Sequence, residues 1–278
     1  MKSVLITGCS SGFGLVTALY FARRGDRVFA TMREPRRGTE LTDAAAREKL
    51  DLRVLPLDVT DPASVTTAVR ACEEVGAIDV VVNNAGIELR SSIEDASDED
   101  VRRQFDTNVF GLLRVVRAVL PGMRARGSGV IANVSSIAGL VARPFGGLYS
   151  ASKHAVEAVS EALHYEVSPF GIRVVLIEPG QYATRLVDNA LLGSGFDRNS
   201  PYRERSDRFD EAMKRLVPGG DRPGPEEVAE IIHRAVHAEP HKLRHLAGSD
   251  AELIASAYRQ LDFEDYEHAM RAQLDWWD

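Results

Sequence analysis

Short apolar runs rich in β-branched residues alternate with longer stretches of helical periodicity along most of this chain. Parallel strands that are buried on both faces have this composition, because the helices that connect them cover the sheet. The alternation therefore predicts an α/β fold with a doubly wound, seven-stranded parallel sheet. The expected strands are Ser3–Thr7, Arg27–Met32, Arg53–Pro56, Val80–Asn83, Gly129–Val134, Arg173–Glu178 and Leu243–Leu246. The expected helices are Gly14–Arg24, Asp61–Val75, Asp98–Met123, Leu148–Ser168 and Pro225–Ala238.

No linker interrupts this alternation, so residues 1–278 are expected to form a single domain. Residues 183–224 depart from it, with several glycines and prolines around a charged helical pattern at Tyr202–Leu216. A loop of this length is a lid, a substrate-binding loop or a disordered segment. Residues 249–278 form a helical tail with an acidic, aromatic end, which is expected to pack against the domain or a partner subunit.

Composition argues against several classes of partner. The 34 basic and 41 acidic residues leave a net charge of −7, and no basic run is interleaved with aromatic residues, so no nucleic-acid surface is expected. No apolar run reaches the roughly 18 residues of a membrane span. The chain passes from Met1-Lys2 directly into the first strand and then a glycine-rich turn, so its first residues are too few for a signal peptide. The two cysteines, Cys9 and Cys72, form no Cys-x-x-Cys pair. We therefore expect a cytoplasmic protein without a thiolate metal site.

A glycine-rich turn follows the first expected strand immediately. It reads Thr7-Gly8-Cys9-Ser10-Ser11-Gly12-Phe13-Gly14 and leads into a helical pattern. Glycines permit a tight turn and close approach of the backbone, so that free N–H groups and the helix N-terminus face a phosphate. The spacing Gly-x-x-x-Gly-x-Gly differs from Gly-x-Gly-x-x-Gly, but its place between strand and helix favours a dinucleotide site over an ordinary turn.

Tyr149 and Lys153 stand four residues apart in an expected helix, which puts the phenol and the ammonium on one face. A tyrosine with a free pKa of about 10 needs a shift of roughly 3 units, or about 4 kcal/mol, to exchange protons near neutral pH. One cation at about 5 Å supplies roughly 3 kcal/mol at an effective dielectric constant of about 20. The pair is therefore a candidate acid-base catalyst, with an ordinary exposed helical pair as the alternative.

Taken in order, these motifs resemble those of the short-chain dehydrogenase/reductase family, in its compact branch with a single Rossmann-type domain. The matching segments are Thr7-Gly8-x-x-x-Gly12-x-Gly14, Asn83-Asn84-Ala85-Gly86, Tyr149-x-x-x-Lys153 and Pro179-Gly180-x-x-x-Thr184. Ser136 stands 13 residues before Tyr149, where the family places its catalytic serine, and Asn108 matches the family's helix asparagine. The resemblance covers residues 1–185 closely and 225–250 loosely.

The resemblance implies hydride transfer between a nicotinamide and a carbonyl or carbinol carbon. Tyr149 is then expected to exchange a proton with the substrate oxygen, to which Ser136 also hydrogen-bonds. Lys153 would hold the nicotinamide ribose and lower the pKa of Tyr149, while Asn108 would hold a water that links Lys153 to solvent. Asp58 matches the family's contact to the adenine amino group, with a capping or loop role as the alternative. The full set of expected cofactor contacts is Gly8, Ser10, Ser11, Gly12, Phe13, Gly14, Arg33, Asp58, Val59, Asn84, Ala85, Gly86, Tyr149, Lys153, Pro179, Gly180, Tyr182 and Thr184.

The residues after the second expected strand favour NADP(H) over NAD. Relatives that use NAD usually carry an acidic residue there for the ribose hydroxyls, whereas this chain has Met32 followed by Arg33. A guanidinium can pair bidentately with a 2′-phosphate, and Ser10 could add a hydrogen bond. Ser11 stands where NADP-preferring relatives often carry a second basic residue, and Glu34 is close by. A solvated charged loop is the alternative.

Segments such as Val141-Ala142-Arg143-Pro144-Phe145 and Ser168-Pro169-Phe170-Gly171 are most similar to the branch that contains type 1 17β-hydroxysteroid dehydrogenase and retinol dehydrogenases. That similarity implies a bulky, apolar ketone or secondary alcohol as the small-molecule substrate. The expected pocket residues are Ser136, Leu140, Val141, Phe145, Tyr149, Tyr182 and Phe196. A 3-ketoacyl reductase and a catalytically silent NADPH-binding regulator are the alternatives. The resemblance also implies a homodimer or homotetramer, formed through the faces of the helices expected over Asp98–Met123 and Leu148–Ser168.

Four histidines recur every four residues, at His233, His237, His241 and His245. The first two could share a helix face and bind a metal. Pro240 interrupts the helix before the third, and the first pair lacks a His-Glu-x-x-His arrangement. We therefore expect a surface or structural role and no metal at these histidines.

Overall fold

The structure is a computed structural model that describes residues 1–184, 190–217 and 222–276. Seven parallel strands form one sheet in the order β3-β2-β1-β4-β6-β7-β9, which confirms the doubly wound fold. The order reverses next to β1, and ligands of such sheets bind outside the carboxyl ends of the strands at this switch point. The strands are β1 (Ser3–Ile6), β2 (Arg27–Met32), β3 (Leu52–Pro56), β4 (Val80–Asn83), β6 (Gly129–Val134), β7 (Ile172–Pro179) and β9 (Arg244–Ala247).

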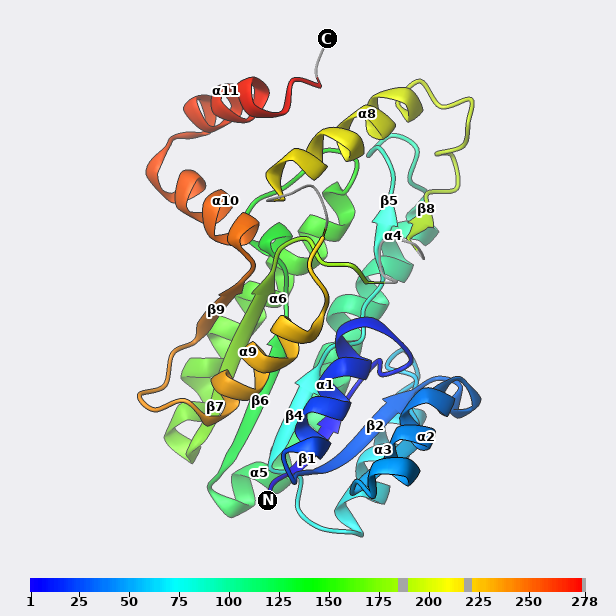
Figure 1. The fold of residues 1–278 in the computed structure, drawn as a ribbon, viewed down its shortest axis with the longest axis vertical. Helices are drawn as coiled ribbons and strands as arrows, with labels where there is room; N and C mark the ends of the chain where they lie inside the picture. Colours follow the sequence, from blue (N-terminus) through cyan, green and yellow to red (C-terminus); the bar gives the residue numbers. More distant parts are fainter. Residues whose placement is uncertain (185–189, 218–221, 277–278) are drawn as a thin grey trace.

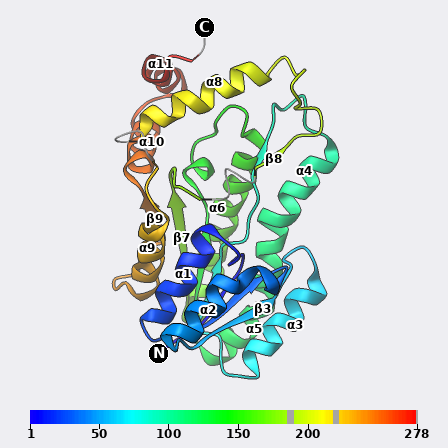
Figure 2. The same ribbon diagram turned by 45° about the vertical axis from the view of Figure 1, so that its right-hand side comes forward.

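Helices cover both faces of the sheet (Figure 1, Figure 2). Successive side chains of a strand point to opposite faces, so Val4 and Ile6 of β1 pack into one apolar cluster and Leu5 into the other. The first cluster lies under α1 (Gly12–Arg23), α2 (Thr39–Glu48) and α9 (Glu226–His237). The second lies under α3 (Pro62–Glu73), α5 (Leu112–Arg126) and α6 (Gly147–Val167).

The helix expected over Asp98–Met123 is divided in the structure, which corrects that prediction. It consists of α4 (Asp98–Phe105), a π-helical turn over Asp106–Gly111, and α5. The first segment begins with a capping box between Ser97 and Asp100. A π turn inserts an extra residue into the helix, and such turns are frequent at functional sites. Asn108 lies in it.

A third layer lies beyond the carboxyl ends of the strands. It contains the short parallel pair β5 (Leu89–Arg90) and β8 (Leu191–Leu192), and the helices α8 (Arg203–Met213), α10 (Ser249–Gln260) and α11 (Phe263–Leu274). Figure 1 shows these helices at the end of the molecule opposite the N-terminus. An apolar cluster joins them through Val141, Phe209, Ala212, Leu216, Ile254, Leu274 and Trp276. Of the expected loop 183–224 and tail 249–278, residues 185–189, 218–221 and 277–278 lie outside the described residues.

None of the described helices combines the length and the apolar character that crossing a lipid bilayer requires.

Candidate active site

The glycine-rich turn between β1 and α1 is held against the end of β4. The Nδ2 group of Asn84 donates to the carbonyl oxygens of Thr7 at 2.9 Å and Gly8 at 3.2 Å. The hydroxyl of Thr7 accepts from the backbone N–H groups of Asn84 and Ala85, both at 3.0 Å. Gly8 has a φ of +74°, and a Cβ at Gly14 would lie only 2.4 Å from the oxygen of Gly8. Both positions therefore require glycine.

The N-terminus of α1 is free to receive an anion. Ser11 is the N-cap residue, but its side chain makes no capping hydrogen bond in the described chain, and the first turn of α1 carries no acidic residue. The first N–H groups of a helix and its partial positive charge together favour a phosphate. A Cβ at Gly12 would lie 3.4 Å from Cβ of Thr184, so the turn faces the segment that follows β7. These features fit the pyrophosphate of a dinucleotide.

The residues expected to face the adenosine lie at the end of β2 and after β3. Arg33 is exposed at the end of that strand and forms no ion pair within the part of the chain that the structure describes. Glu34 pairs instead with Arg36, Oε2 to Nη2 at 2.7 Å, and this hydrogen bond lowers the pKa of Glu34. The Oδ1 atom of Asp58 accepts from the N–H of Thr60 at 2.9 Å and from its hydroxyl at 2.8 Å, so the side chain has a loop role. Its expected contact to the adenine amino group stays a prediction.

Tyr149 and Lys153 are both buried on α6, next to the end of β6. The Nζ of Lys153 donates to the carbonyl oxygen of Val134 at 2.8 Å and lies 5.7 Å from the ring centroid of Tyr149. Burial lowers the pKa of Lys153 from 10.5 to about 8, and the negative charge of Glu157 acts in the opposite direction. The pair is not an exposed helical pair.

Burial has the opposite effect on Tyr149, because it disfavours the charged phenolate. Desolvation raises the pKa of Tyr149, and the negative charge of Glu88 raises it further. A hydrogen bond with Ser136 and the positive charge of Arg143 oppose this increase. Desolvation of the phenolate therefore outweighs Arg143 in the net pKa of Tyr149, and the lowering expected from Lys153 stays a prediction.

Ser136 lies two residues after β6 and faces the end of β7. Its hydroxyl accepts from the N–H of Ala138 at 3.1 Å and lies 3.4 Å from the carbonyl oxygen of Pro179, to which it donates. These contacts fix the serine at the end of the sheet, where it lowers the pKa of the neighbouring Tyr149. Its equally plausible neighbour, Ser135, is buried and lies beside Glu157.

Asn108 links three parts of the site from the π-helical turn. Its Oδ1 accepts from the N–H of Ile87 at 2.9 Å, and its Nδ2 donates to the oxygen of Ile87 at 3.0 Å and to Ser152 at 3.1 Å. These bonds join the loop after β4 to α6. The expected role of Asn108 in holding a water stays a prediction.

A buried cluster of charges lies behind Lys153. Glu157, one helical turn further along α6, pairs with Arg244 of β9 at 2.9 Å, and the fully buried Glu178 pairs with the same guanidinium at 3.1 Å. Burial and the negative charge of Glu157 raise the pKa of Glu178. Sequence reasoning did not identify this cluster, because its members come from three separate elements.

A cavity of about 680 Å³ opens beside Ser136 and Tyr149. Apolar residues of α8, α10 and α11, and Trp276 just after them, form part of its wall: Phe209, Met213, Ile254, Met270, Leu274 and Trp276. Among the expected cofactor contacts, Phe13, Pro179, Gly180, Tyr182 and Thr184 also line it, so the dinucleotide site and the cavity adjoin. The helical pattern of the tail was the only sequence signal for the residues of α10 and α11.

Four of the seven expected pocket residues line this cavity: Ser136, Val141, Tyr149 and Tyr182. Leu140, Phe145 and Phe196 are not among the described residues that line it, which corrects their assignment. Phe145 has a φ of +57° and turns toward Phe209 and Trp276, with ring centroids 6.3 and 6.0 Å away. Phe196 is fully buried and stacks on Phe145 at 6.4 Å, while Leu140 packs against the same apolar cluster.

Two ion pairs belong to the polar part of the cavity wall. Arg143 pairs with the buried Glu88, and Arg90 pairs with Asp210 at 2.7 Å. The residues of the first pair influence Tyr149 in opposite directions, since Glu88 raises and Arg143 lowers the pKa of the phenol. Neither pair was expected from the sequence.

A family model described as short chain dehydrogenase matches residues 2–192. The chain belongs to the short-chain dehydrogenase family. The uncharacterized oxidoreductase YusZ of Bacillus subtilis is 38% identical over 98% of each chain. Human 17-beta-hydroxysteroid dehydrogenase type 1 is 36% identical, over 87% of this chain and 76% of that protein. A crystal structure of a short-chain dehydrogenase from Streptomyces avermitilis superposes with a TM-score of 0.82, at 33% identity and 98% coverage of each chain. Like its relatives in the family, this chain is an oxidoreductase.

Proposed function

We propose that the chain is an NADP(H)-dependent oxidoreductase that transfers a hydride between the nicotinamide and a hydrophobic ketone or secondary alcohol. The observation that carries this proposal is the buried Tyr149, with Ser136 beside it, on the wall of a largely apolar cavity of about 680 Å³. Ligand pockets for compounds of steroid, retinoid or similar lipid size are about 300–1,000 Å³. The cavity volume lies within this range.

The bound nicotinamide supplies or accepts the hydride. In the direction of reduction, Tyr149 donates its proton to the substrate oxygen, and in oxidation it takes the proton back. The raised pKa of Tyr149 keeps the phenol protonated near neutral pH, which is the form that a general acid needs. Ser136 hydrogen-bonds the same oxygen and orients it. Lys153 would hold the nicotinamide ribose, since its ammonium is anchored by Val134 next to Tyr149.

Arg33 supports the proposed preference for NADP(H). Its guanidinium is exposed at the end of β2, and the nearest acidic neighbour in sequence, Glu34, is already paired with Arg36. A 2′-phosphate at this edge would gain a charge-assisted, bidentate partner. Ser10, half-buried in the glycine-rich turn, would be a second donor.

The third layer supports a bulky apolar substrate. The helices α8, α10 and α11 contribute apolar side chains to the wall of the cavity that Ser136 and Tyr149 also line. The human relative named 17-beta-hydroxysteroid dehydrogenase type 1 acts, by its name, on a hydroxysteroid, which is a bulky and largely apolar molecule. The ion pairs Glu88–Arg143 and Arg90–Asp210 would contact the polar groups of such a substrate.

We also propose that the chain forms a homodimer or homotetramer through α5 and α6. Large aromatic side chains are exposed on this side of the molecule, with Phe110 of the π turn 50% and Tyr165 of α6 77% exposed. Burial of such side chains between subunits is typical of oligomers.

An NADPH-oxidation screen over steroid, retinoid, acyl and sugar ketones, run beside NADH, tests the proposed activity. We expect turnover with apolar ketones and NADPH. A strong preference for NADH would contradict the role of Arg33, and turnover of acyl thioesters alone would support the 3-ketoacyl reductase. Tight NADPH binding, with no oxidation in the presence of any ketone and no effect of Tyr149→Phe, would indicate the silent regulator.

A further inference from the structure

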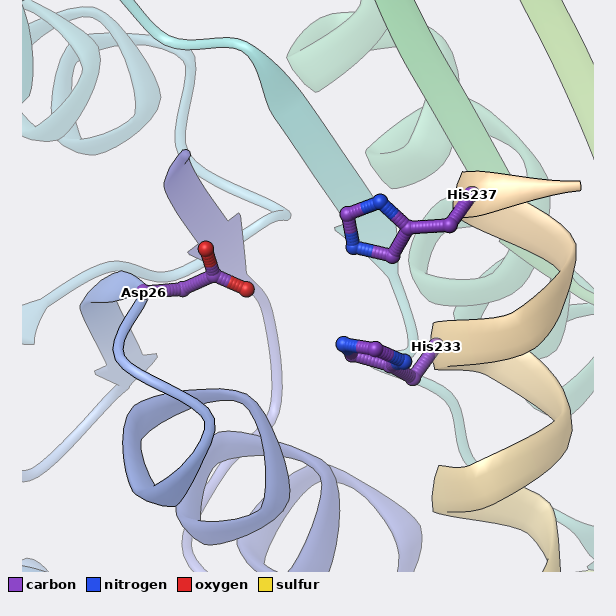
Figure 3. A group of neighbouring side chains, drawn as sticks. All are labelled: Asp26, His233 and His237. Carbon is purple, nitrogen blue, oxygen red and sulfur yellow. The ribbon is translucent and has the colours of Figure 1, made fainter. Parts of the chain in front are cut away.

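Three side chains that could bind a metal meet at the amino-terminal edge of the sheet, far from the cavity. His233 and His237 lie one helical turn apart on α9, and Asp26 lies in the turn between α1 and β2. One ligand atom from each of the three lies within 4.8 Å of the other two. Figure 3 shows the carboxylate and both imidazoles pointing into the same space. The strands begin at this edge, so the group is separate from the site at their carboxyl ends.

Packing already restricts these side chains. Asp26 is 6% exposed, and its Oδ1 accepts from the backbone N–H of Lys2 at 2.8 Å, which orients the carboxylate. The ring of His233 packs edge-on against Tyr20 and Phe21, with centroids 5.4 and 4.9 Å away. Ligands that are held in place before binding lose less conformational entropy when a metal binds.

The electrostatic surroundings favour neutral imidazoles. Burial is the main cause that lowers the pKa of both His233 and His237. A neutral imidazole keeps the lone pair that a metal needs. The other cations that face the two rings are Arg24, Lys2, Arg173 and the N-terminal amine, whereas Asp26 supplies the opposing negative charge. These cations reduce the attraction for a metal ion, so binding should be of moderate strength.

We propose that Asp26, His233 and His237 form a Zn²⁺ site with the fourth position open to water. Two imidazoles and one carboxylate are a donor set that suits zinc and similar transition metals rather than Mg²⁺ or Ca²⁺. Donor atoms bonded to one tetrahedral Zn²⁺ at about 2.0–2.2 Å lie about 3.4 Å apart, so modest side-chain rotations close the site from its present spacing. This proposal replaces the expectation of no metal at these histidines. That expectation was reached without Asp26, which lies far away in the sequence.

The proposed zinc site links the turn before β2 to α9. Both α1 and α9 cover the same face of the sheet. A ligand that binds only the folded protein stabilises it by mass action. Zinc at this position therefore has a structural role. It raises the thermal stability of the protein and leaves hydride transfer at the opposite edge of the sheet unchanged.

Zinc titration of the untagged, full-length chain after treatment with a chelator tests this proposal. We expect one zinc per chain with a dissociation constant below about 100 µM, and a melting temperature that rises with zinc concentration. The variants His237→Asn and Asp26→Asn should each weaken binding by about tenfold or more, while their circular dichroism matches the wild type. His268→Asn changes an exposed histidine outside the site and should bind zinc like the wild type.

Two results would overturn the proposal. One is a dissociation constant weaker than about 100 µM in the wild type. The other is equal zinc binding by the wild type, His237→Asn and Asp26→Asn, which would place the ion elsewhere. Because zinc binding and melting temperature are measured without substrate, either result is independent of the proposed enzymatic function.

Discussion

The buried ammonium of Lys153 lowers the free energy of unfolding of the protein. The substitution Lys153→Met should show the size of this effect. Burial lowers the pKa of this lysine from 10.5 to about 8. The difference is about 2.5 units, and each unit corresponds to about 1.4 kcal/mol, so the buried ammonium destabilises the folded state by about 3 kcal/mol below pH 8.

The pH dependence of this cost has a defined sign. The folded-state pKa is lower than the unfolded-state pKa, so the unfolded chain binds more protons between pH 8 and pH 10.5. The free energy of unfolding of the wild type therefore gains a contribution that increases with pH through this window. The penalty is fully present below pH 8 and disappears above pH 10.5.

The Lys153→Met variant lacks this titration. Its free energy of unfolding relative to the wild type should fall by about 2–3 kcal/mol between about pH 7 and pH 10. The variant also loses the hydrogen bond to Val134, which costs about 1 kcal/mol at every pH and does not change the slope.

Urea denaturation followed by circular dichroism at several pH values measures this difference. Lys214→Met is the matched control, because the side chain of Lys214 is 52% exposed, and its difference from the wild type should vary little with pH. A difference between Lys153→Met and the wild type that stays constant across this range would refute the reasoning. It would mean that Lys153 is protonated in the fold as readily as in the unfolded chain.

Three further substitutions test the cofactor site and the cavity. Gly14→Ala places a Cβ 2.4 Å from the oxygen of Gly8; overpacking costs about 1–3 kcal/mol, so fluorescence titration should give an NADPH dissociation constant raised about tenfold or more. Unchanged affinity would show that the turn tolerates the methyl group. Arg33→Ala should lower the ratio of kcat/KM with NADPH to kcat/KM with NADH by about tenfold or more, since a charge-assisted hydrogen bond contributes about 1.5–3 kcal/mol. An unaltered ratio would remove Arg33 from 2′-phosphate recognition. Val141→Trp fills part of the cavity wall and should raise KM for bulky ketones while NADPH affinity is kept; equal KM values would place the substrate elsewhere.

Much of the fold could be predicted from the sequence, because buried parallel strands have a distinctive composition. All seven expected strands of the sheet are present, with ends that coincide or differ by one residue. The helix α2 was missed because its sequence is mostly polar, with Leu41 and Ala44 as its buried residues. The π turn over Asp106–Gly111 was missed because the apolar pattern continues through it.

The candidate site was predictable where residues are close in sequence or match a motif. The spacing of Tyr149, Lys153 and Ser136 predicted that their side chains lie close together. This was possible because Tyr149 and Lys153 share one helix and Ser136 lies just after one strand. The far wall of the cavity was not predictable, since it depends on how α8, α10 and α11 pack. Phe145 was misplaced because its direction depends on a left-handed backbone conformation that no spacing rule indicates.

The proposed proton donor is tested most directly by single-turnover hydride transfer. The enzyme and NADPH are mixed rapidly with an apolar ketone that the wild type reduces, and NADPH oxidation is followed for the wild type and Tyr149→Phe. Loss of a general acid should slow the hydride-transfer step by about 10²–10⁴-fold, while NADPH affinity changes little. Tyr165→Phe, at an exposed tyrosine on the same helix, should react like the wild type. A Tyr149→Phe enzyme with the wild-type rate would contradict the account.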